Sequence, residues 1–350
     1  MARILIKNGK IFDGNSLVCK DLFAENGEIT KIEPRIDDDC DFVFDAKDKL
    51  VLPGLIDVHI HMQGHSSDAF SFSPELATLP FGVTSACDAG SSLGDDDALD
   101  AISLKSVNYI LYRENHGKND ELLEKYKRHV KGIKVYFDTA ESRGVRKEDL
   151  IRACEYARQR ELSVMVHTSN SPIPMAEIAE ILSAGDIITH TYHGGVHTAE
   201  ENDFEAFKIA KERGVLMDAG FAGHIHTDFG VLTRSFAAGF IPDTISTDIT
   251  KLSAYTRGGR YGMTMCMSIA REAGMNEIDI FKAVTENPAK ALGKKNEWGA
   301  LKVGRKADIA VLDYLDESFV LTDKAGNVIK NQKGYKCLLT VLDGQVIYRH

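Results

Sequence analysis

The sequence predicts an α/β fold, a (β/α)8 TIM barrel that carries a small composite β-sandwich domain built from both termini. Two observations predict it. The middle of the chain alternates short apolar runs with helical patterns, which is typical of repeated βα units and a parallel sheet. Both ends of the chain instead show short strand patterns separated by turn residues. We expect residues 1–52 and 299–350 to form the sandwich and residues 53–298 to form the barrel.

The terminal segments hold short apolar stretches bounded by turn-forming dipeptides. Turns are expected at Asn8-Gly9 and Asn26-Gly27, and Asp343-Gly344 marks a tight turn near the other end. The expected strands are residues 4–6, 10–12, 22–24, 29–32, 307–312, 338–342 and 345–348. We expect a small antiparallel sheet to which both ends of the chain contribute.

Eight apolar runs in the middle predict the barrel strands, at residues 54–61, 83–88, 107–112, 132–137, 163–167, 186–190, 215–218 and 244–248. Most begin about 23 to 32 residues apart, the size of one βα unit, and eight such units favour a closed barrel over an open sheet. The expected helices include residues 148–159, 177–183, 200–213 and 278–292.

Composition and charge narrow the class of protein. The chain has 350 residues, 43% of them hydrophobic, and a formal net charge of −10. Nucleic acid and anionic membrane are disfavoured as partners, because both require a positively charged surface. The N-terminus lacks the pattern of a signal peptide and no long apolar span follows it. We therefore expect a cytoplasmic protein whose partner is a small molecule.

The six cysteines form no CxxC pair, so the sequence signals neither a disulfide framework nor a thiolate zinc site. We expect most of them to be small buried residues. Cys87 lies at the end of a predicted barrel strand, and its role stays open.

The first barrel strand ends in a pair of histidines. Because alternate side chains of a strand point to opposite faces, Asp57, His59 and His61 share one face and the apolar residues between them share the other. Active sites of barrel enzymes lie at this C-terminal end of the strands. A lone pair of this kind also suits a purely structural role.

Other predicted strands end in the same way. His167 and His190 close their strands, and Asp248 lies on the opposite face from the apolar residues of the eighth run. Four imidazoles and a carboxylate at one barrel mouth suit a borderline cation such as zinc, which accepts histidine nitrogen and carboxylate oxygen.

Lys134 lies on the inward face of its predicted strand. Burial disfavours a charged ammonium and favours the neutral amine. A neutral amine can add carbon dioxide to form a carbamate, whose two oxygens can bridge two metal ions. The alternative is a lysine that extends to the barrel rim or pairs with an acid.

The ordered set of these residues resembles the amidohydrolase superfamily over nearly the whole chain. Further resemblance lies in residues 52–57, Leu-Pro-Gly-Leu-Ile-Asp, in residues 286–290, Glu-Asn-Pro-Ala-Lys, and in residues 304–308, Gly-Arg-Lys-Ala-Asp. The resemblance implies a metal-dependent barrel with a small β-sandwich, and oligomers are frequent in such families. We therefore expect a homo-oligomer.

The resemblance also implies a binuclear centre with two divalent ions, expected to be zinc. His59, His61 and Asp248 would hold one ion, and His167 and His190 the other. Carboxylated Lys134 would bridge both ions. A bridging hydroxide would be the nucleophile that attacks an amide (N-acyl) or ester bond, and Asp248 would be the catalytic general acid/base.

Within the superfamily, residues 188–194 and 242–249 resemble the dihydroorotase-related deacetylase branch. Dihydroorotases carry an arginine shortly after the paired histidines, where this chain has Met62 and Gln63, which disfavours that activity. The branch usually carries asparagine where His193 stands and histidine where Thr250 stands. Candidate substrate-binding residues follow the strands: they are His65, Tyr136, Tyr192, His193, His224 and Arg257.

Three other functions are weighed. A cyclic-amide hydrolase of the dihydroorotase or hydantoinase type fits the branch but lacks the arginine. A non-catalytic assembly or binding protein would have no reason to keep the whole ligand set. A mononuclear deaminase is disfavoured because its resemblance would place a His-x-x-Glu pair at the sixth strand, where His190 is followed by Thr191, Tyr192 and His193.

Overall fold

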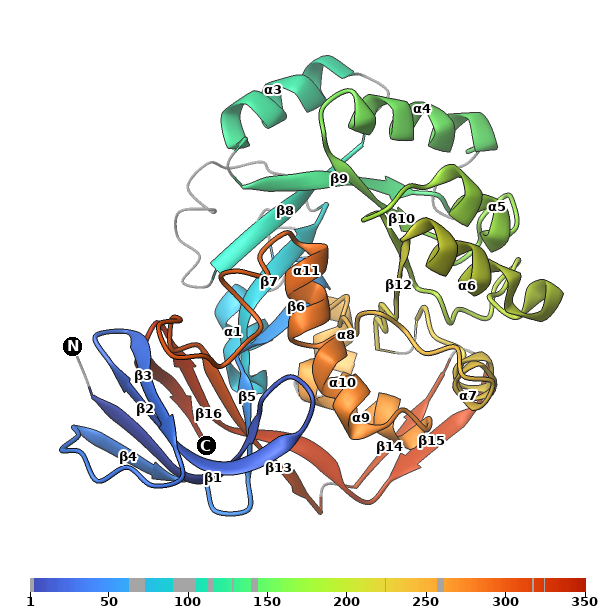
Figure 1. Cartoon of the computed structure of the whole chain (residues 1–350). Helices are drawn as coiled ribbons and strands as arrows, with labels where there is room; N and C mark the ends of the chain where they lie inside the picture. The colour runs from blue at the N-terminus through green and yellow to red at the C-terminus, as the bar shows by residue number, and fades with distance from the viewer. Residues whose placement is uncertain are drawn as a thin grey trace.

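The computed structural model describes residues 3–62, 73–90, 105–112, 116–127, 129–139, 144–223, 225–256, 261–316, 318–323 and 325–350. Its described strands form an eight-stranded sheet, a seven-stranded sheet and a two-stranded sheet. Figure 1 shows the eight-stranded sheet at the lower left, with both chain ends beside it. None of the described helices is long and apolar enough to cross a membrane.

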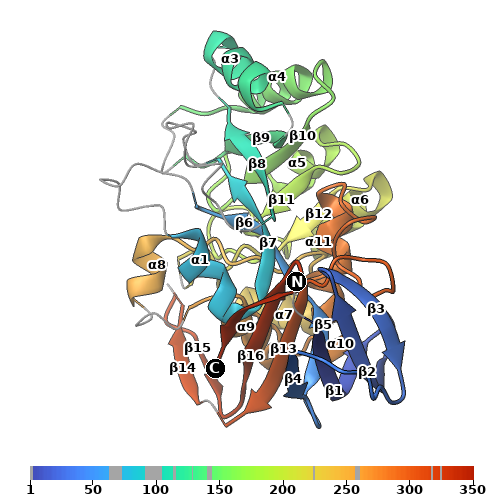
Figure 2. The same cartoon turned by 90° about the vertical axis from the view of Figure 1, so that its left-hand side faces the viewer.

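Strands from both ends of the chain form the eight-stranded sheet. They are β1 (Ile4–Phe12), β2 (Leu17–Glu25), β3 (Glu28–Glu33), β4 (Phe42–Asp45), β5 (Leu50–Pro53), β13 (Ile309–Leu315), β16 (Gly334–Leu342) and β17 (Gln345–Arg349). β5 joins the two halves, because it pairs with β1 on one side and with β13 on the other. Figure 2 shows both termini at this sheet.

Two details of this sheet differ from the expectation. The sheet is mixed rather than antiparallel, since β4 and β5 run parallel to β1. The expected turn at Asn8-Gly9 does not separate two strands; it is an irregularity in the pairing of one continuous strand, β1, with β2. Asn8 takes a left-handed φ of +59° there, and its N–H donates to Asp21.

The seven-stranded sheet is parallel and follows chain order. It consists of β6 (Leu55–Ile60), β7 (Val83–Ala89), β8 (Lys105–Leu111), β9 (Val130–Tyr136), β10 (Ser163–His167), β11 (Ile187–Thr189) and β12 (Leu216–Asp218). Each strand confirms one of the first seven expected runs. This sheet curls into the barrel wall.

The eighth run closes the ring without forming a regular strand. Single parallel bridges join Asp218 to Thr244 and Ile60 to Ile249, so the segment contacts β12 on one side and β6 on the other. The Asp248 N–H also donates to the carbonyl of His59 at 2.7 Å. Asp248 itself has a left-handed φ of +46°, which interrupts an extended strand at this point.

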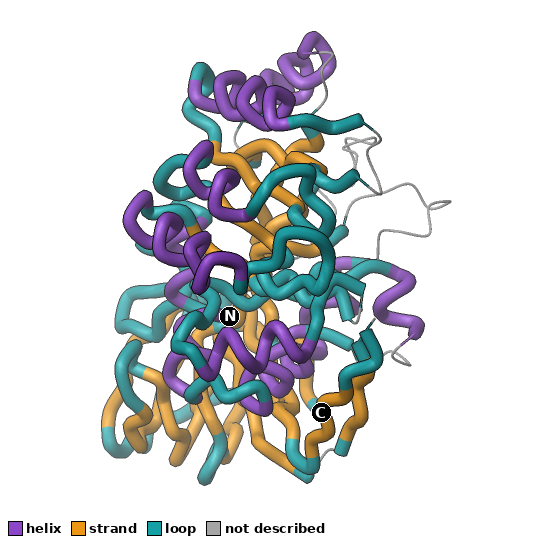
Figure 3. Tube along the Cα trace, turned by 90° about the vertical axis from the view of Figure 1, so that its right-hand side faces the viewer, coloured by secondary structure: helices purple, strands orange, loops and turns teal. Residues whose placement is uncertain are grey.

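Helices follow the barrel strands and lie outside them (Figure 3). They are α1 (Pro74–Thr78), the short η1 (Leu79–Phe81), α3 (His116–Tyr126), α4 (Lys147–Arg158), α5 (Met175–Ile181), α6 (Glu201–Arg213), α7 (Phe229–Ala237), α8 (Lys251–Thr256), α9 (Met263–Glu272), α10 (Glu277–Ala283) and α11 (Glu286–Ala291). The expected helix at 278–292 is two helices. Pro288 cannot donate to the carbonyl of Val284 and clashes with it, so the helix breaks before it. A hairpin of β14 (Phe319–Thr322) and β15 (Val328–Asn331) completes the fold.

Cys87 belongs to the apolar interior. Its side chain is fully buried in a cluster with Ile56, Val58 and Tyr109. Burial raises the pKa of its thiol well above the ordinary value, which keeps the sulfur protonated. These contacts assign Cys87 to packing of the barrel.

Candidate metal centre

Six polar side chains meet where the barrel strands end. They come from β6, β9 and β10, from the residues directly after β6 and β11, and from the closing segment, and each is at most 6% exposed. They are the ligands expected from the sequence: His59, His61, Lys134, His167, His190 and Asp248. Buried polar groups of this density require partners or a cation.

One group centres on the carboxylate of Asp248. Its Oδ1 lies 2.9 Å from Nε2 of His61 and 3.2 Å from Nε2 of His59, and Nζ of Lys134 lies 3.0 Å from the same His59 nitrogen. Burial alone would raise the pKa of Asp248, but the imidazoles of His59 and His61 outweigh it and hold that pKa well below the ordinary value. An ionised carboxylate beside two imidazole nitrogens is a suitable donor set for zinc.

A second group consists of His167, His190 and His226. Their ring centroids are 4.3 to 4.8 Å apart, and one potential ligand atom from each lies within 4.8 Å of the others. His226 follows β12, and its Nδ1 lies 2.8 Å from Oγ of Ser169. The ligand set expected from the sequence does not include His226. Its place in the loop after β12, where barrel enzymes carry functional residues, is the signal that could have found it.

The donor set fits a divalent cation. His190 uses Nδ1 to bond the carbonyl of Gly220 at 2.7 Å, while its buried Nε2 has no hydrogen-bond partner among the described residues. Burial lowers the pKa of His167 to about 3 and that of His190 well below its ordinary value. Both rings are therefore neutral at pH 7, the form that binds a metal.

Lys134 is enclosed on every side. It is fully buried, and besides His59 its Nζ contacts the sulfur of Met165 at 3.4 Å. A Cβ built on Gly90 would lie 2.8 Å from Cβ of Lys134, so Gly90 leaves the space that the lysine stem fills. Burial of this kind disfavours the ammonium form.

Hydrogen bonds behind the ligands fix the ring of His59. Its Nδ1 lies 2.8 Å from Oγ1 of Thr189, and that hydroxyl donates to Asp218 at 2.7 Å. Asp218 also accepts from the hydroxyls of Thr244 and Ser246, each at 2.7 Å. Such outer contacts orient a liganding imidazole and select its tautomer.

Two of the ligand residues adopt strained backbone conformations. His190 has a φ of +63° and Asp248 a φ of +46°, a region that residues with a Cβ seldom occupy. Left-handed residues that are not glycine concentrate at functional sites, where the surrounding contacts over-determine them.

Five of the six expected ligands, all but Lys134, line a cavity of about 350 Å³, to which Tyr136 also contributes. A second cavity, of about 440 Å³, shares Ile225 and His226 with the first and includes His193 in its wall. The structure does not bring Tyr192 to either cavity: its ring is buried and its hydroxyl donates to the carbonyl of Phe240. The expected substrate contacts at His65, His224 and Arg257 lie outside the described residues.

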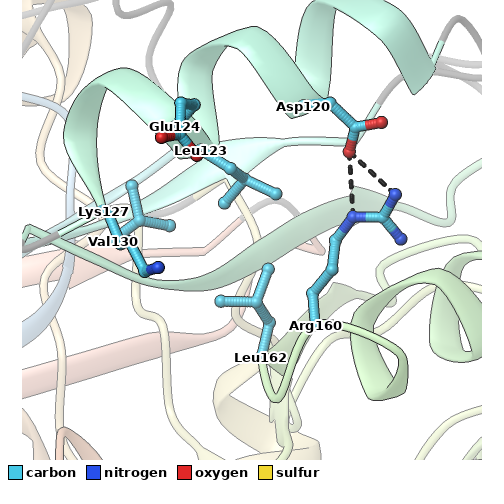
Figure 4. Close-up of a pocket in the computed structure, with 7 residues that line it drawn as sticks. All are labelled: Asp120, Leu123, Glu124, Lys127, Val130, Arg160 and Leu162. Atoms are coloured by element: carbon cyan, nitrogen blue, oxygen red, sulfur yellow. Dashed lines mark hydrogen bonds and ion pairs between the residues drawn. The ribbon is translucent and has the colours of Figure 1, made fainter.

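Another pocket lies at the opposite end of the barrel strands (Figure 4). Val130 begins β9 and Leu162 immediately precedes β10, so the pocket opens beside the N-terminal ends of these strands. Its polar contact is an ion pair between Asp120 and Arg160 at 2.8 Å. This face of a barrel usually contributes to stability rather than to catalysis.

Comparisons with known proteins agree with this architecture. A deacetylase of Agrobacterium fabrum is 27% identical over 333 residues, covering 87% of this chain and 80% of its own length. A deacetylase of Brucella anthropi is 26% identical, covering 93% of this chain and 87% of its own length. A solved dihydroorotase structure has a TM-score of 0.86 at 22% identity and covers 100% of this chain and 98% of its own.

The model of the amidohydrolase family matches residues 50–347, which include the whole barrel and all six ligand residues. The family model therefore matches most of the chain. A metal-dependent hydrolase acting on C–N bonds is the activity that this match and the deacetylase relatives support. The chain belongs to the amidohydrolase family.

Proposed function

We propose that the protein is a binuclear metal-dependent hydrolase that cleaves an amide (N-acyl) or ester bond of a small molecule. The observation that carries the proposal is the convergence of four imidazoles and a carboxylate in the wall of one cavity, with Nζ of Lys134 3.0 Å from Nε2 of His59. The deacetylase names of two relatives support removal of an acyl group.

In this proposal His59, His61 and Asp248 hold one ion, His167 and His190 hold the other, and carboxylated Lys134 lies between them. Zinc suits these nitrogen and oxygen donors. When bound, the ions activate a water and polarise the substrate carbonyl. The imidazoles of His167 and His190 keep their lone pairs available because burial disfavours their protonation.

Asp248 moves the proton. Its carboxylate is ionised because two imidazoles stabilise the charge, so it can accept a proton from the attacking water at its Oδ atoms. It then passes this proton to the amine or alcohol that leaves. The hydrogen bond from the Asp248 N–H to the His59 carbonyl fixes the position of the residue during both steps.

Replacement of Lys134 tests the binuclear proposal. Lys134→Ala removes the proposed bridge, and we expect metal content to fall below two ions per chain and hydrolysis of N-acetyl compounds to drop by more than about 100-fold. Elemental mass spectrometry and initial-rate assays measure the two effects. Lys131→Ala, on the same strand but on the other face, is the matched control.

The outcomes separate the alternatives. Full activity of Lys134→Ala would remove the bridging role. Wild-type protein that holds one ion points to a mononuclear mechanism. Protein that binds none after reconstitution with zinc and bicarbonate points to a non-catalytic assembly or binding protein.

A cyclic-amide hydrolase is the second candidate, because the dihydroorotase fold matches this chain over its full length. Assays on dihydroorotate and hydantoins, run beside linear N-acetyl compounds, distinguish ring opening from deacylation. Turnover of the cyclic compounds alone would favour this candidate.

We further propose that the protein is cytoplasmic, as expected from the sequence, and that it forms a homo-oligomer, as the family resemblance implies. Light scattering of the purified protein tests the oligomeric state. Fractionation of the source cells tests the compartment.

A further inference from the structure

We propose that the cavity of about 440 Å³ beside the metal centre binds the leaving group of the substrate, and that it takes an uncharged hydroxylated or an amine-bearing group rather than an anionic one. This inference rests on the proposed acyl hydrolysis. We call this cavity the polar annex; the polar side chains in its wall are Asp138, Ser169, Asn170, His193, His226, Thr227 and Asp228.

The polar annex directly adjoins the metal centre. Ile225 and His226 line both cavities. Asp138 in the annex wall contacts Nε2 of His167 at 3.2 Å, and Ser169 contacts the ring of His226 at 2.8 Å. A substrate with its carbonyl in the metal cavity can therefore extend its adjoining group into the annex.

Among the residues that the structure describes, His193 supplies a buried donor without a partner. Its side chain is 2% exposed, and its Nδ1 accepts a hydrogen bond from the N–H of Gly195 at 3.1 Å. Because Nδ1 is the acceptor of this hydrogen bond, the ring carries its proton on Nε2. That Nε2 has no partner among the described residues, although a buried donor ordinarily has one. An oxygen of a ligand would satisfy it.

The turn that carries His193 is held rigidly. A Cβ built on Gly194 would lie 2.6 Å from Oδ2 of Asp228, and one on Gly195 would lie 1.9 Å from the carbonyl of Ser169. Only glycine permits these approaches, which fix the position of the His193 ring. The annex is thus a preformed site.

Charge and size select the kind of group. Among the described residues, the walls of the annex contain two carboxylates, of Asp138 and Asp228, and no lysine or arginine. An anionic group would be repelled there, whereas a hydroxyl or ammonium can donate to a carboxylate. The metal cavity is smaller, at about 350 Å³, so a short acyl group fits it and the larger leaving group fits the annex.

A matched set of N-acetyl substrates tests the inference. The released amines should be of similar size and carry hydroxyls, a second amine or a carboxylate. We expect kcat/KM to be at least about tenfold higher for the first two classes than for the third, the scale at which an unpaired polar contact discriminates substrates. A preference for the carboxylate class would overturn the inference.

A second measurement, the binding of the released amines, does not depend on catalysis. If neither N-acyl compounds nor esters are hydrolysed, the proposed function fails. Calorimetric titration of the zinc-loaded protein with an amino alcohol and with an amino acid of the same size still decides the inference. Tighter binding of the amino alcohol supports it. Equal or weaker binding contradicts it.

Variants of His193 locate the contact. We expect His193→Phe to raise KM for hydroxylated substrates about tenfold with unchanged metal content, and His193→Gln, which retains a donor, to recover much of this loss. His197→Phe, on the same loop, is the control. Unchanged KM and amine binding in both His193 variants would show that the donor meets no ligand.

Discussion

At the residue scale, Asp218 acts on the metal centre through other side chains. It receives hydroxyl hydrogen bonds from Thr189, Thr244 and Ser246, and Thr189 in turn contacts His59. An amide in place of this carboxylate would present an NH2 group where a hydroxyl now donates. The His59 ring would lose its fixed orientation without losing a ligand atom.

We therefore expect Asp218→Asn to weaken binding of zinc by about 10- to 100-fold, with the same number of ions as wild type bound at saturating zinc. Competition with a chromogenic chelator measures the affinity. Asp203→Asn, an exposed position on α6, is the control. If Asp218→Asn and wild type compete equally, the carboxylate has no part in orienting His59.

The convergence of these side chains could be predicted from the sequence because each of those on strands alternates with apolar neighbours on the other face; that they bind metal stays a prediction. His59 and Lys134 illustrate this, since period-two patterning identifies the inward face without any tertiary information. His226 was missed as a neighbour of His167 and His190 because it lies in a loop, where no periodicity gives its direction. Tyr192 was expected near substrate, yet it packs against Phe207 and Phe236 instead.

At the element scale, β9 depends on a glycine two residues before Lys134. A Cβ built on Gly132 would lie 2.2 Å from the carbonyl of Ser163 on β10 and 2.5 Å from the ring of Tyr109 on β8. The backbone of β9 cannot move away from these atoms without disturbing its pairing with β8 and β10. The inward direction of Lys134 therefore depends on this close packing.

Gly132→Ala should lower the free energy of unfolding by about 1 to 3 kcal/mol, the usual cost of overpacking. Urea unfolding of the metal-free protein, followed by circular dichroism, measures the change. Lys131→Ala, the neighbouring position, should unfold within about 0.5 kcal/mol of wild type. Identical urea midpoints for all three proteins would mean that β8 and β10 make room for the added Cβ at little cost in free energy.

The elements that sequence reasoning missed share a physical cause. β4 and β5 are four residues each, too short for alternation to appear, and their place in the sheet depends on pairing with distant segments. The expected domain boundary at 52/53 stays a prediction, as does the one at 298/299. The eighth run lacks a regular strand because Asp248 departs from extended geometry.

At the scale of the whole molecule, buried neutral histidines make stability depend on pH. The pKa of His193 is about 4 in the folded protein and about 6.5 when unfolded, so below pH 6.5 the unfolded chain binds the proton first. The contribution of His193 to the free energy of unfolding is therefore fully present above pH 6.5 and is lost as the pH falls towards 4. The loss reaches on the order of 3 kcal/mol from this residue.

Urea unfolding of the metal-free protein at pH 7.5, 6 and 5 measures this dependence. We expect stability to fall with pH over this range and His193→Gln to show a shallower decline. A variant with the same slope as wild type would assign the acid sensitivity to other groups.

The pairing of β5 with β13 has a consequence for biosynthesis. Leu50 to Pro53 leave the ribosome long before Ile309 to Leu312, their partners, have been translated. At about 5 to 20 residues per second, the roughly 250 intervening residues take on the order of 10 to 50 s. Throughout that interval the nascent N-terminal strands present an unpaired edge, the kind of surface that other chains can pair with. Slower translation therefore lengthens the time for which this edge can pair with other chains.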